Sequence, residues 1–320
     1  MLLFCIAVLI GFVLLAWSAD RFVDGASSIA RILGVPPMII GLTIVSLGTS
    51  APEIVVSILA AMDGTPGMAI GNALGSNIAN IGLVLGLTAL IAPLTVRSQL
   101  IKRELPILFL VMLLALGLML DGELGRLDGF VLLAGLVVMF WWLVLLGMRD
   151  RKDALQDEFS ESVPTSQPIH KSILWFVTGL IVLVLASRLV VWGAVHIAQT
   201  FGVSDLVIGL TIVAVGTSLP EVMACIVSVL KNEPDIAIGN VVGSNMVNIL
   251  AVLSMPALID PQIFEAEVLY RDMPVMFAFT LVLFLVAYGF RGPGRINRIE
   301  GGVLLSGFCA YLLLLYAMSY

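Results

Sequence analysis

The sequence predicts an all-α polytopic membrane protein in which ten transmembrane helices form two inverted five-helix repeats. Composition is the first observation: 60% of the 320 residues are hydrophobic, 12% are charged, and the mean hydropathy is +1.11. Such values lie far outside those of soluble domains. Duplication is the second observation, because GLTIVSLGTSAPE at 41–53 returns as GLTIVAVGTSLPE at 209–221, 168 residues later, with ten of thirteen positions identical.

Apolar runs long enough to cross a bilayer, which takes about 20 helical residues, are the third observation. We count ten, at residues 2–20, 37–62, 67–92, 104–121, 127–147, 171–192, 206–230, 236–257, 273–290 and 300–318. The first and sixth can extend towards residues 31 and 199. A soluble protein with many buried helices would need polar helix faces, which these runs lack. The first run has no basic segment before it, so we do not expect a cleaved signal peptide.

Two copies of five spans make up the chain. Residues 1–147 form the first repeat and residues 171–320 the second. Because five is an odd number, the second copy enters the membrane from the opposite side, an architecture common among secondary transporters. The charged segment 148–170 is too short for a domain, and we interpret it as a solvated linker.

The distribution of Lys and Arg predicts the orientation. Threaded in order, the loops of one side carry thirteen basic residues and those of the other side three, namely Arg126, Arg188 and Arg271. Basic residues concentrate in cytoplasmic loops. We therefore expect a multi-pass protein of the cytoplasmic (inner) membrane, with both termini outside and the linker 148–170 in the cytoplasm.

Glu53 and Glu221 are the ionisable residues placed deepest inside predicted spans. A carboxylate near the bilayer centre costs several kcal/mol, so such residues usually face a cavity and have a function. The alternative is a structural glutamate tied to a neighbouring helix. No Lys or Arg is expected at the same depth, which favours mobile cations as the partners of the two carboxylates.

The residues before each glutamate are also rich in oxygen. Thr49 lies one helical turn before Glu53, and Thr217 lies one turn before Glu221. Pro52 and Pro220 should open the helix and free the carbonyls of Gly48 and Gly216. A simple kink is the alternative reading of the prolines.

The following helix of each repeat carries a polar stripe with a residue at every fourth position. The stripes and the amides that flank them are Asn72, Ser76, Asn77 and Asn80 in the first repeat, and Asn240, Ser244, Asn245 and Asn248 in the second. Hydrogen bonding between helices is the alternative for these residues, above all for Asn72 and Asn240. The glycines between them, Gly71, Gly75, Gly239 and Gly243, favour close helix packing.

Together these groups form an all-oxygen, flexible ligand set. Such a set suits Na⁺ and Ca²⁺ and argues against Zn²⁺ and Cu⁺, which prefer sulfur and imidazole. Cys5, Cys225 and Cys309 are scattered through apolar runs and read as small hydrophobic residues.

These motifs resemble the alpha-1 and alpha-2 repeats of the calcium/cation antiporter superfamily, in its sodium/calcium exchanger branch. The similarity is carried by GTSAPE with GNALGSNIAN within 41–80, and by GTSLPE with GNVVGSNMVN within 209–248. The short linker replaces the large regulatory insert of animal members, so the chain looks like a prokaryotic-type exchanger.

The resemblance implies roles for individual residues. Residues matching Glu53, Glu221, Thr49 and Thr217 would ligate the central Ca²⁺ or Na⁺. Flanking sodium sites would use Ser76, Ser244 and the backbone carbonyls of Ser46 and Ala214. The positions of Asn80 and Asn248 are Asn or Asp in the family, and two Asn residues resemble the potassium-independent members. Asn77 and Asn245 complete the candidate set.

We therefore expect an antiporter that exchanges Na⁺ for Ca²⁺ by alternating access, and not an enzyme. A proton-coupled cation exchanger and, less favoured, a cation channel are the alternatives. No cofactor and no nucleic-acid partner are expected beyond the transported ions and the bilayer, and a monomer should suffice. The first and sixth helices are candidate moving elements, with Gly25, Gly34, Gly193 and Gly202 as candidate hinges.

Overall fold

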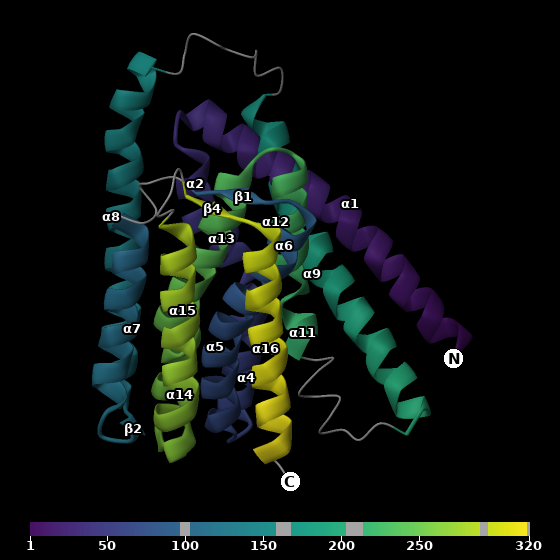
Figure 1. Ribbon diagram of the computed structural model, residues 1–320, viewed down its shortest axis with the longest axis vertical. Coiled ribbons are helices and arrows are strands. Elements are labelled where there is room, and N and C mark those ends of the chain that lie inside the picture. The colour runs from purple at the N-terminus through teal and green to yellow at the C-terminus, as the bar shows by residue number, and fades with distance from the viewer. Residues whose placement is uncertain (97–102, 158–167, 203–213, 289–293, 319–320) are drawn as a thin grey trace.

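The computed structural model describes residues 1–96, 103–157, 168–202, 214–288 and 294–318, and the side chains of 147–157 lie outside that description. Nearly all of the described chain is helical, and the helices form an upright bundle with one oblique helix pair beside it (Figure 1). The N-terminus lies at the far end of this oblique pair, away from the bundle.

The first half begins with one long helix and continues with helices that are repeatedly interrupted. The elements are α1 (Leu2–Leu33), α2 (Pro37–Ile40), the π-helical segment η1 (Gly41–Val45), α3 (Ser46–Thr49), α4 (Ala51–Met62), α5 (Pro66–Ala79), the π-helical segment η2 (Asn80–Leu85), α6 (Gly86–Ile91), β1 (Leu94–Thr95), α7 (Leu105–Met119), β2 (Glu123–Leu124) and α8 (Arg126–Asp157).

The second half repeats this order. Its elements are α9 (Ile169–Thr200), α11 (Ala214–Thr217), α12 (Leu219–Leu230), α13 (Pro234–Val247), the π-helical segment η6 (Asn248–Val252), α14 (Ser254–Ile259), β3 (Gln262–Ile263), the π-helical segment η7 (Val268–Asp272), α15 (Met273–Ala287), β4 (Arg295–Ile296) and α16 (Arg298–Met318).

Within the described residues, seven helices are long and apolar enough to cross a membrane. The pair Pro37–Thr49 and Ala51–Met62, bent by 41° at its break, makes an eighth if it is counted as one span. Two further apolar helices, Leu105–Met119 and Leu219–Leu230, are shorter. The predicted span 206–230 starts in residues that lie outside the description. The structure confirms an all-helical polytopic membrane fold.

The oblique pair consists of α1 and α9, which run antiparallel and cross through glycines. A Cβ atom on Gly25 would lie 2.5 Å from the backbone nitrogen of Phe176, and one on Gly179 would lie 2.6 Å from that of Phe22. Gly11 lies against Val190 and Gly193 against Val8, where an added Cβ would meet a valine methyl group at 2.5 Å and 2.7 Å. Each of these contacts has its counterpart 168 residues along the chain, so one contact is used twice.

This packing revises the hinge hypothesis for two of the four glycines. Gly25 and Gly193 lie inside continuous helices and serve to bring the two backbones close together. Gly34 does end α1, with φ at 63°, and Gly202 follows α9 with φ at 76°. Both adopt the left-handed conformation that glycine tolerates.

Four short strands, which the sequence did not indicate, form two antiparallel pairs. Leu94 and Thr95 of β1 pair with Ile296 and Arg295 of β4, while β2 pairs with β3. Residues 94–95 and 262–263 are 168 positions apart, so each pair joins the same two parts of the repeat. The β1–β4 pair lies near the top of Figure 1, and β2 lies at the bottom.

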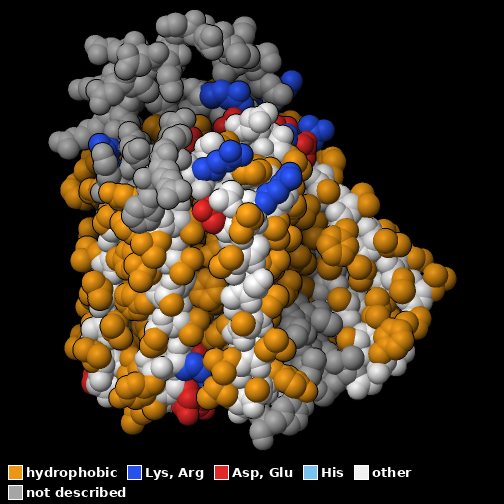
Figure 2. Space-filling model, viewed as in Figure 1, with side chains coloured by type: hydrophobic (Ala, Val, Ile, Leu, Met, Phe, Trp, Pro, Cys, Tyr) orange, Lys and Arg blue, Asp and Glu red, His pale blue; other side chains and the backbone are white. Residues whose placement is uncertain are grey.

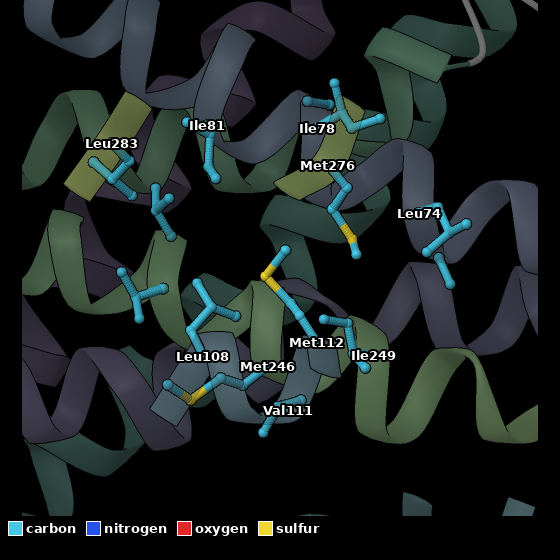
Figure 3. Close-up of a cluster of buried hydrophobic side chains, with 14 of the residues drawn as sticks. Leu74, Ile78, Ile81, Leu108, Val111, Met112, Met246, Ile249, Met276 and Leu283 are labelled. Atoms are coloured by element: carbon cyan, nitrogen blue, oxygen red, sulfur yellow. The ribbon is translucent and has the colours of Figure 1, made fainter. Parts of the chain in front are cut away.

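The centre of the bundle is made by α5 and α13. Their apolar faces pack against α7 and α15 in a core that includes Leu74, Ile78, Met112, Met246 and Met276 (Figure 3). Hydrophobic side chains also cover the flanks of the bundle in the view of Figure 2, while Lys and Arg gather mainly near its upper end. The polar faces of α5 and α13 are thereby turned towards the broken helices.

Candidate cation site

Two breaks of one residue each, between α3 and α4 and between α11 and α12, position the two glutamates. Ser50 and Ser218 interrupt the helices with nearly the same backbone angles, φ −83°, ψ 4° and φ −87°, ψ 1°. Each glutamate follows three residues later, in the first turn of the next helix. Helix N-termini stabilise negative charge. The break therefore places each carboxylate where the local backbone favours an anion.

Both carboxylates are buried, with exposed fractions of 2% for Glu53 and 1% for Glu221. They lie close enough to repel each other. No ion pair involves either of them among the described residues, although Arg and Lys side chains pair with acids elsewhere. Two uncompensated negative charges at this depth are costly unless a cation neutralises them.

The site is shared between the two halves. The hydroxyl of Ser50 donates to Oε1 of Glu221 over 3.4 Å. Thr49 donates to Oδ1 of Asn240 at 3.0 Å. Residues of the first repeat thus contact both polar helices of the second.

Asn72 and Asn240 fasten the broken helices to the central ones. The amide nitrogen of Asn72 donates to the backbone carbonyl of Glu53 at 3.0 Å and to the hydroxyl of Ser57 at 3.1 Å. Asn240 donates to Sγ of Cys225 at 3.5 Å, in addition to accepting from Thr49. The interpretation that Asn72 and Asn240 form hydrogen bonds between helices is therefore confirmed.

The π-helical segments η2 and η6 begin at Asn80 and Asn248. Isolated π-turns widen a helix and often occur at functional sites. Asn80 donates to Oδ1 of Asn245 at 3.0 Å, joining the two central helices. Asn248 is 1% exposed, and neither polar atom of its amide has a hydrogen-bond partner in the described part of the chain.

Among the described residues, six buried oxygen atoms on the broken helices, at the second break and on the central helices have no hydrogen-bond partner. They are Glu53 Oε2, Glu221 Oε2, Asn77 Oδ1, Ser218 Oγ, Ser244 Oγ and Asn248 Oδ1. An unsatisfied buried polar group costs roughly 1–3 kcal/mol. Carboxylate, amide and hydroxyl oxygens are also the ligands of hard cations, so bound cations would satisfy several of these atoms together.

The backbone carbonyls depart from the simple expectation. The Gly216 carbonyl accepts a hydrogen bond of 2.7 Å from the hydroxyl of Ser187 on α9, so it is not left free by the break. Position 19, the counterpart of 187, is alanine. The Ser46 carbonyl accepts the backbone N–H of Ser50 at 3.0 Å. The two halves of the site are therefore not equivalent.

The remaining candidates are partly described. Ser76 is buried on α5, and Thr217 is half-buried at the end of α11. Ala214 begins α11, and its side chain lies outside the described residues. Gly239 and Gly243 pack directly on Gly41 and Leu42, which confirms their close-packing role. Gly71 and Gly75 meet no neighbour among the described residues, and positions 209 and 210, the counterparts of Gly41 and Leu42, lie outside them.

Three residues at the site escaped the sequence analysis. Ser50 and Ser218 lie inside the repeated GTS–PE motif, so their identity in both copies was the available signal. Ser187 gave no signal, because it lies on a different span and has no polar counterpart. Its role depends on how α9 packs against the break.

The family model described as "Sodium/calcium exchanger protein" matches residues 3–145 and 171–317. The chain is 50% identical over 318 residues to "Putative antiporter CaxA" of Alkalimonas amylolytica, covering 99% of this chain and 100% of that protein. It is 41% identical over 322 residues to "Inner membrane protein YrbG" of Escherichia coli, covering 100% and 98%. A solved structure of the sodium-calcium exchanger NCX_Mj, soaked with Na⁺ and Ca²⁺, superposes with a TM-score of 0.83, 33% identity and 98% coverage of both chains.

Proposed function

This chain belongs to the sodium/calcium exchanger family, and from that premise we propose that it exchanges Na⁺ for Ca²⁺ at the Glu53–Glu221 site. It is thus a membrane antiporter of cations and not an enzyme. The proposal assigns the two carboxylates, Thr49 and Thr217 to the central ions. The observation that carries it is a pair of buried carboxylates that, with buried oxygens from both halves, lack ion-pair or hydrogen-bond partners for at least one oxygen among the described residues.

Exchange follows from the charge of the site. The two carboxylates sum to −2, which one Ca²⁺ neutralises and which several Na⁺ ions can share. The two sets of ions compete for the same oxygens, so neither can bind fully while the other occupies the site. Because Asn80 and Asn248 are both uncharged, they add oxygens without adding charge. We assign the flanking Na⁺ sites to Ser76, Ser244 and the carbonyls of Ser46 and Ala214, with Asn77 and Asn245 beside them.

We propose ten spans in two inverted repeats, residues 1–147 and 171–320, joined by the linker 148–170. Two observations support the inversion. The twin helices α1 and α9 run antiparallel through paired contacts, and the equivalent strand pairs β1–β4 and β2–β3 lie towards opposite ends of the molecule (Figure 1). One chain supplies both carboxylates, so a monomer is sufficient.

The proposed membrane is the cytoplasmic (inner) membrane, with both termini outside and the linker in the cytoplasm. The gathering of Lys and Arg near the upper end of the molecule supports this orientation (Figure 2). The name of the E. coli relative, an inner membrane protein, supports the location.

Alternating access would carry the ions across. We assign the movement to α1 and α9, because their glycine crossing makes them one unit. The pair lies obliquely beside the bundle that holds the carboxylates (Figure 1). Motion of a packed helix pair around a fixed midplane site is a common mechanism of inverted-repeat transporters.

Calcium uptake into proteoliposomes loaded with Na⁺ tests the function. We expect uptake with an outward Na⁺ gradient and none after the gradient is removed. Uptake driven instead by a pH gradient would replace the sodium-coupled proposal with the proton-coupled alternative. A calcium current without countertransport would indicate a channel and would also overturn the proposal.

A further inference from the structure

One face of α1 is fastened by charges to the turn between α12 and α13. Nζ of Lys231 lies 2.8 Å from Oδ1 of Asp20 and 2.5 Å from Oδ1 of Asp24. In the same turn, Oε1 of Glu233 accepts a hydrogen bond of 2.5 Å from Ser27 and lies 4.0 Å from Arg31. We call the cluster of Lys231, Asp20 and Asp24 the first latch.

The first latch joins elements with different roles. The turn connects α12, which carries Glu221 in its first turn, to α13, which carries Asn240 and Ser244. Asp20 and Asp24 are four residues apart on one helix face, where like charges repel. The shared lysine offsets this repulsion, and it therefore stabilises the position of α1 against the turn.

The duplication places a second charge pair of reversed sign at the equivalent position of the other half. Arg188 on α9 is the counterpart of Asp20, and Asp63, in the turn after α4, is the counterpart of Lys231. Both side chains are exposed, and no ion pair joins them in the described residues. The helix packing at the two equivalent positions differs as well. Helix α1 lies along α12, whereas α9 does not pack comparably against α4.

We infer that Lys231 and Asp63 are positioning residues whose ion pairs form in alternation and set the side to which the cation site opens. The structure holds the conformer in which the first latch is closed. In the opposite conformer α9 lies against α4, Arg188 pairs with Asp63, and Lys231 releases α1. This inference rests on the alternating access of the proposed function.

The two latches are not equally strong. The counterpart of Asp24 is Trp192, and that of Glu233 is Thr65. Arg188 and Asp63, the second latch, can therefore form only one ion pair. The first latch has a lysine between two carboxylates, and Glu233 forms further contacts with α1 beside it. The ion-free protein should accordingly favour the conformer with the first latch closed.

Electron–electron distance measurements on the ion-free full chain test this inference. Spin labels at Met68→Cys and Phe201→Cys, both exposed, would report the separation of α5 from the end of α9, in a background of Cys5→Ser and Cys309→Ser. The conformer in which α9 lies against α4 should give the shorter distance between the two labels. Lys231→Gln should increase the population of that conformer by about tenfold, a shift of about 1.4 kcal/mol. Asp63→Asn should decrease that population.

The controls separate charge from general loosening. Lys231→Arg keeps the cation and should keep the parent distribution. Shifts of Lys231→Gln and Asp63→Asn in the same direction, no shift in either, or an Arg variant that behaves like the Gln variant would each overturn the inference. Because the distances are measured without Na⁺ or Ca²⁺, they are independent of which ions the vesicle experiment shows to be exchanged.

Discussion

Glu221→Gln removes one of the two negative charges of the proposed cation site with almost no change in volume. At about 4 Å and an effective dielectric constant of about 20, a carboxylate attracts a univalent cation by about 4 kcal/mol and a divalent cation by about twice as much. With 1% exposure, Glu221 gets little screening from water. We expect Ca²⁺ affinity to fall by at least a thousandfold, and by more than Na⁺ affinity does.

In the absence of ions, Glu221→Gln should stabilise the protein. Glu221 repels Glu53 and has an unpartnered oxygen, so its neutral replacement relieves a destabilising interaction. We expect the melting temperature of Glu221→Gln to rise in the absence of Na⁺ and Ca²⁺. A variant that was merely misfolded would instead melt at a lower temperature.

Equilibrium binding of radioactive Ca²⁺ to the purified protein measures the first effect, and thermal denaturation with and without ions measures the second. Glu265→Gln is the matched control, because Glu265 is an exposed carboxylate and its loss should change neither quantity. Ca²⁺ affinity of Glu221→Gln within tenfold of the parent would refute the two-carboxylate site.

Three further predictions concern close packing and hydrogen bonds between helices, and each is measured by thermal or denaturant unfolding of the ion-free protein. Gly239→Ala should destabilise by about 1–3 kcal/mol, because its Cβ would lie 2.6 Å from the Met38 carbonyl, whereas Gly67→Ala meets no neighbour and should not destabilise. Ser187→Ala should cost about 1–3 kcal/mol by leaving the Gly216 carbonyl unpaired; Ser172→Ala, which removes an unpartnered hydroxyl on the same helix, should cost less. Tyr311→Phe removes a 2.9 Å hydrogen bond to Oδ1 of Asp272 and should cost about 1.5–3 kcal/mol; equal stability of variant and parent would contradict this assignment.

Much of the architecture could be predicted from the sequence, because a bilayer imposes strong constraints on composition. Long apolar runs identified the helices, and the 168-residue repeat identified equivalent positions. Glu53 and Glu221 were found because a charge inside an apolar run is unusual in any context. Such features are local, and they do not depend on which helix packs beside which.

Features that depend on packing could not be predicted. Ser187 reaches Gly216 only because α9 lies beside the second break, and Lys231 reaches Asp20 only because α1 lies along α12. The close approach of Gly25 to Phe176 likewise needs the crossing of two helices 151 positions apart in the chain. Differences between the halves could not be predicted for a second reason, because a sequence repeat indicates only the features that both copies share.

The crossing of α1 and α9 also bears on how such a protein can arise. Gly11 and Val190 meet in the same way as Gly179 and Phe22, with the two halves exchanging roles. Two identical subunits related by a twofold axis form this kind of isologous interface. Under the inverted five-helix repeats proposed above, a single such chain inserted in both orientations would already have made this contact as a homodimer. Fusion of two copies would then have preserved an existing dimer and allowed Ser187 and Lys231 to diverge from their counterparts.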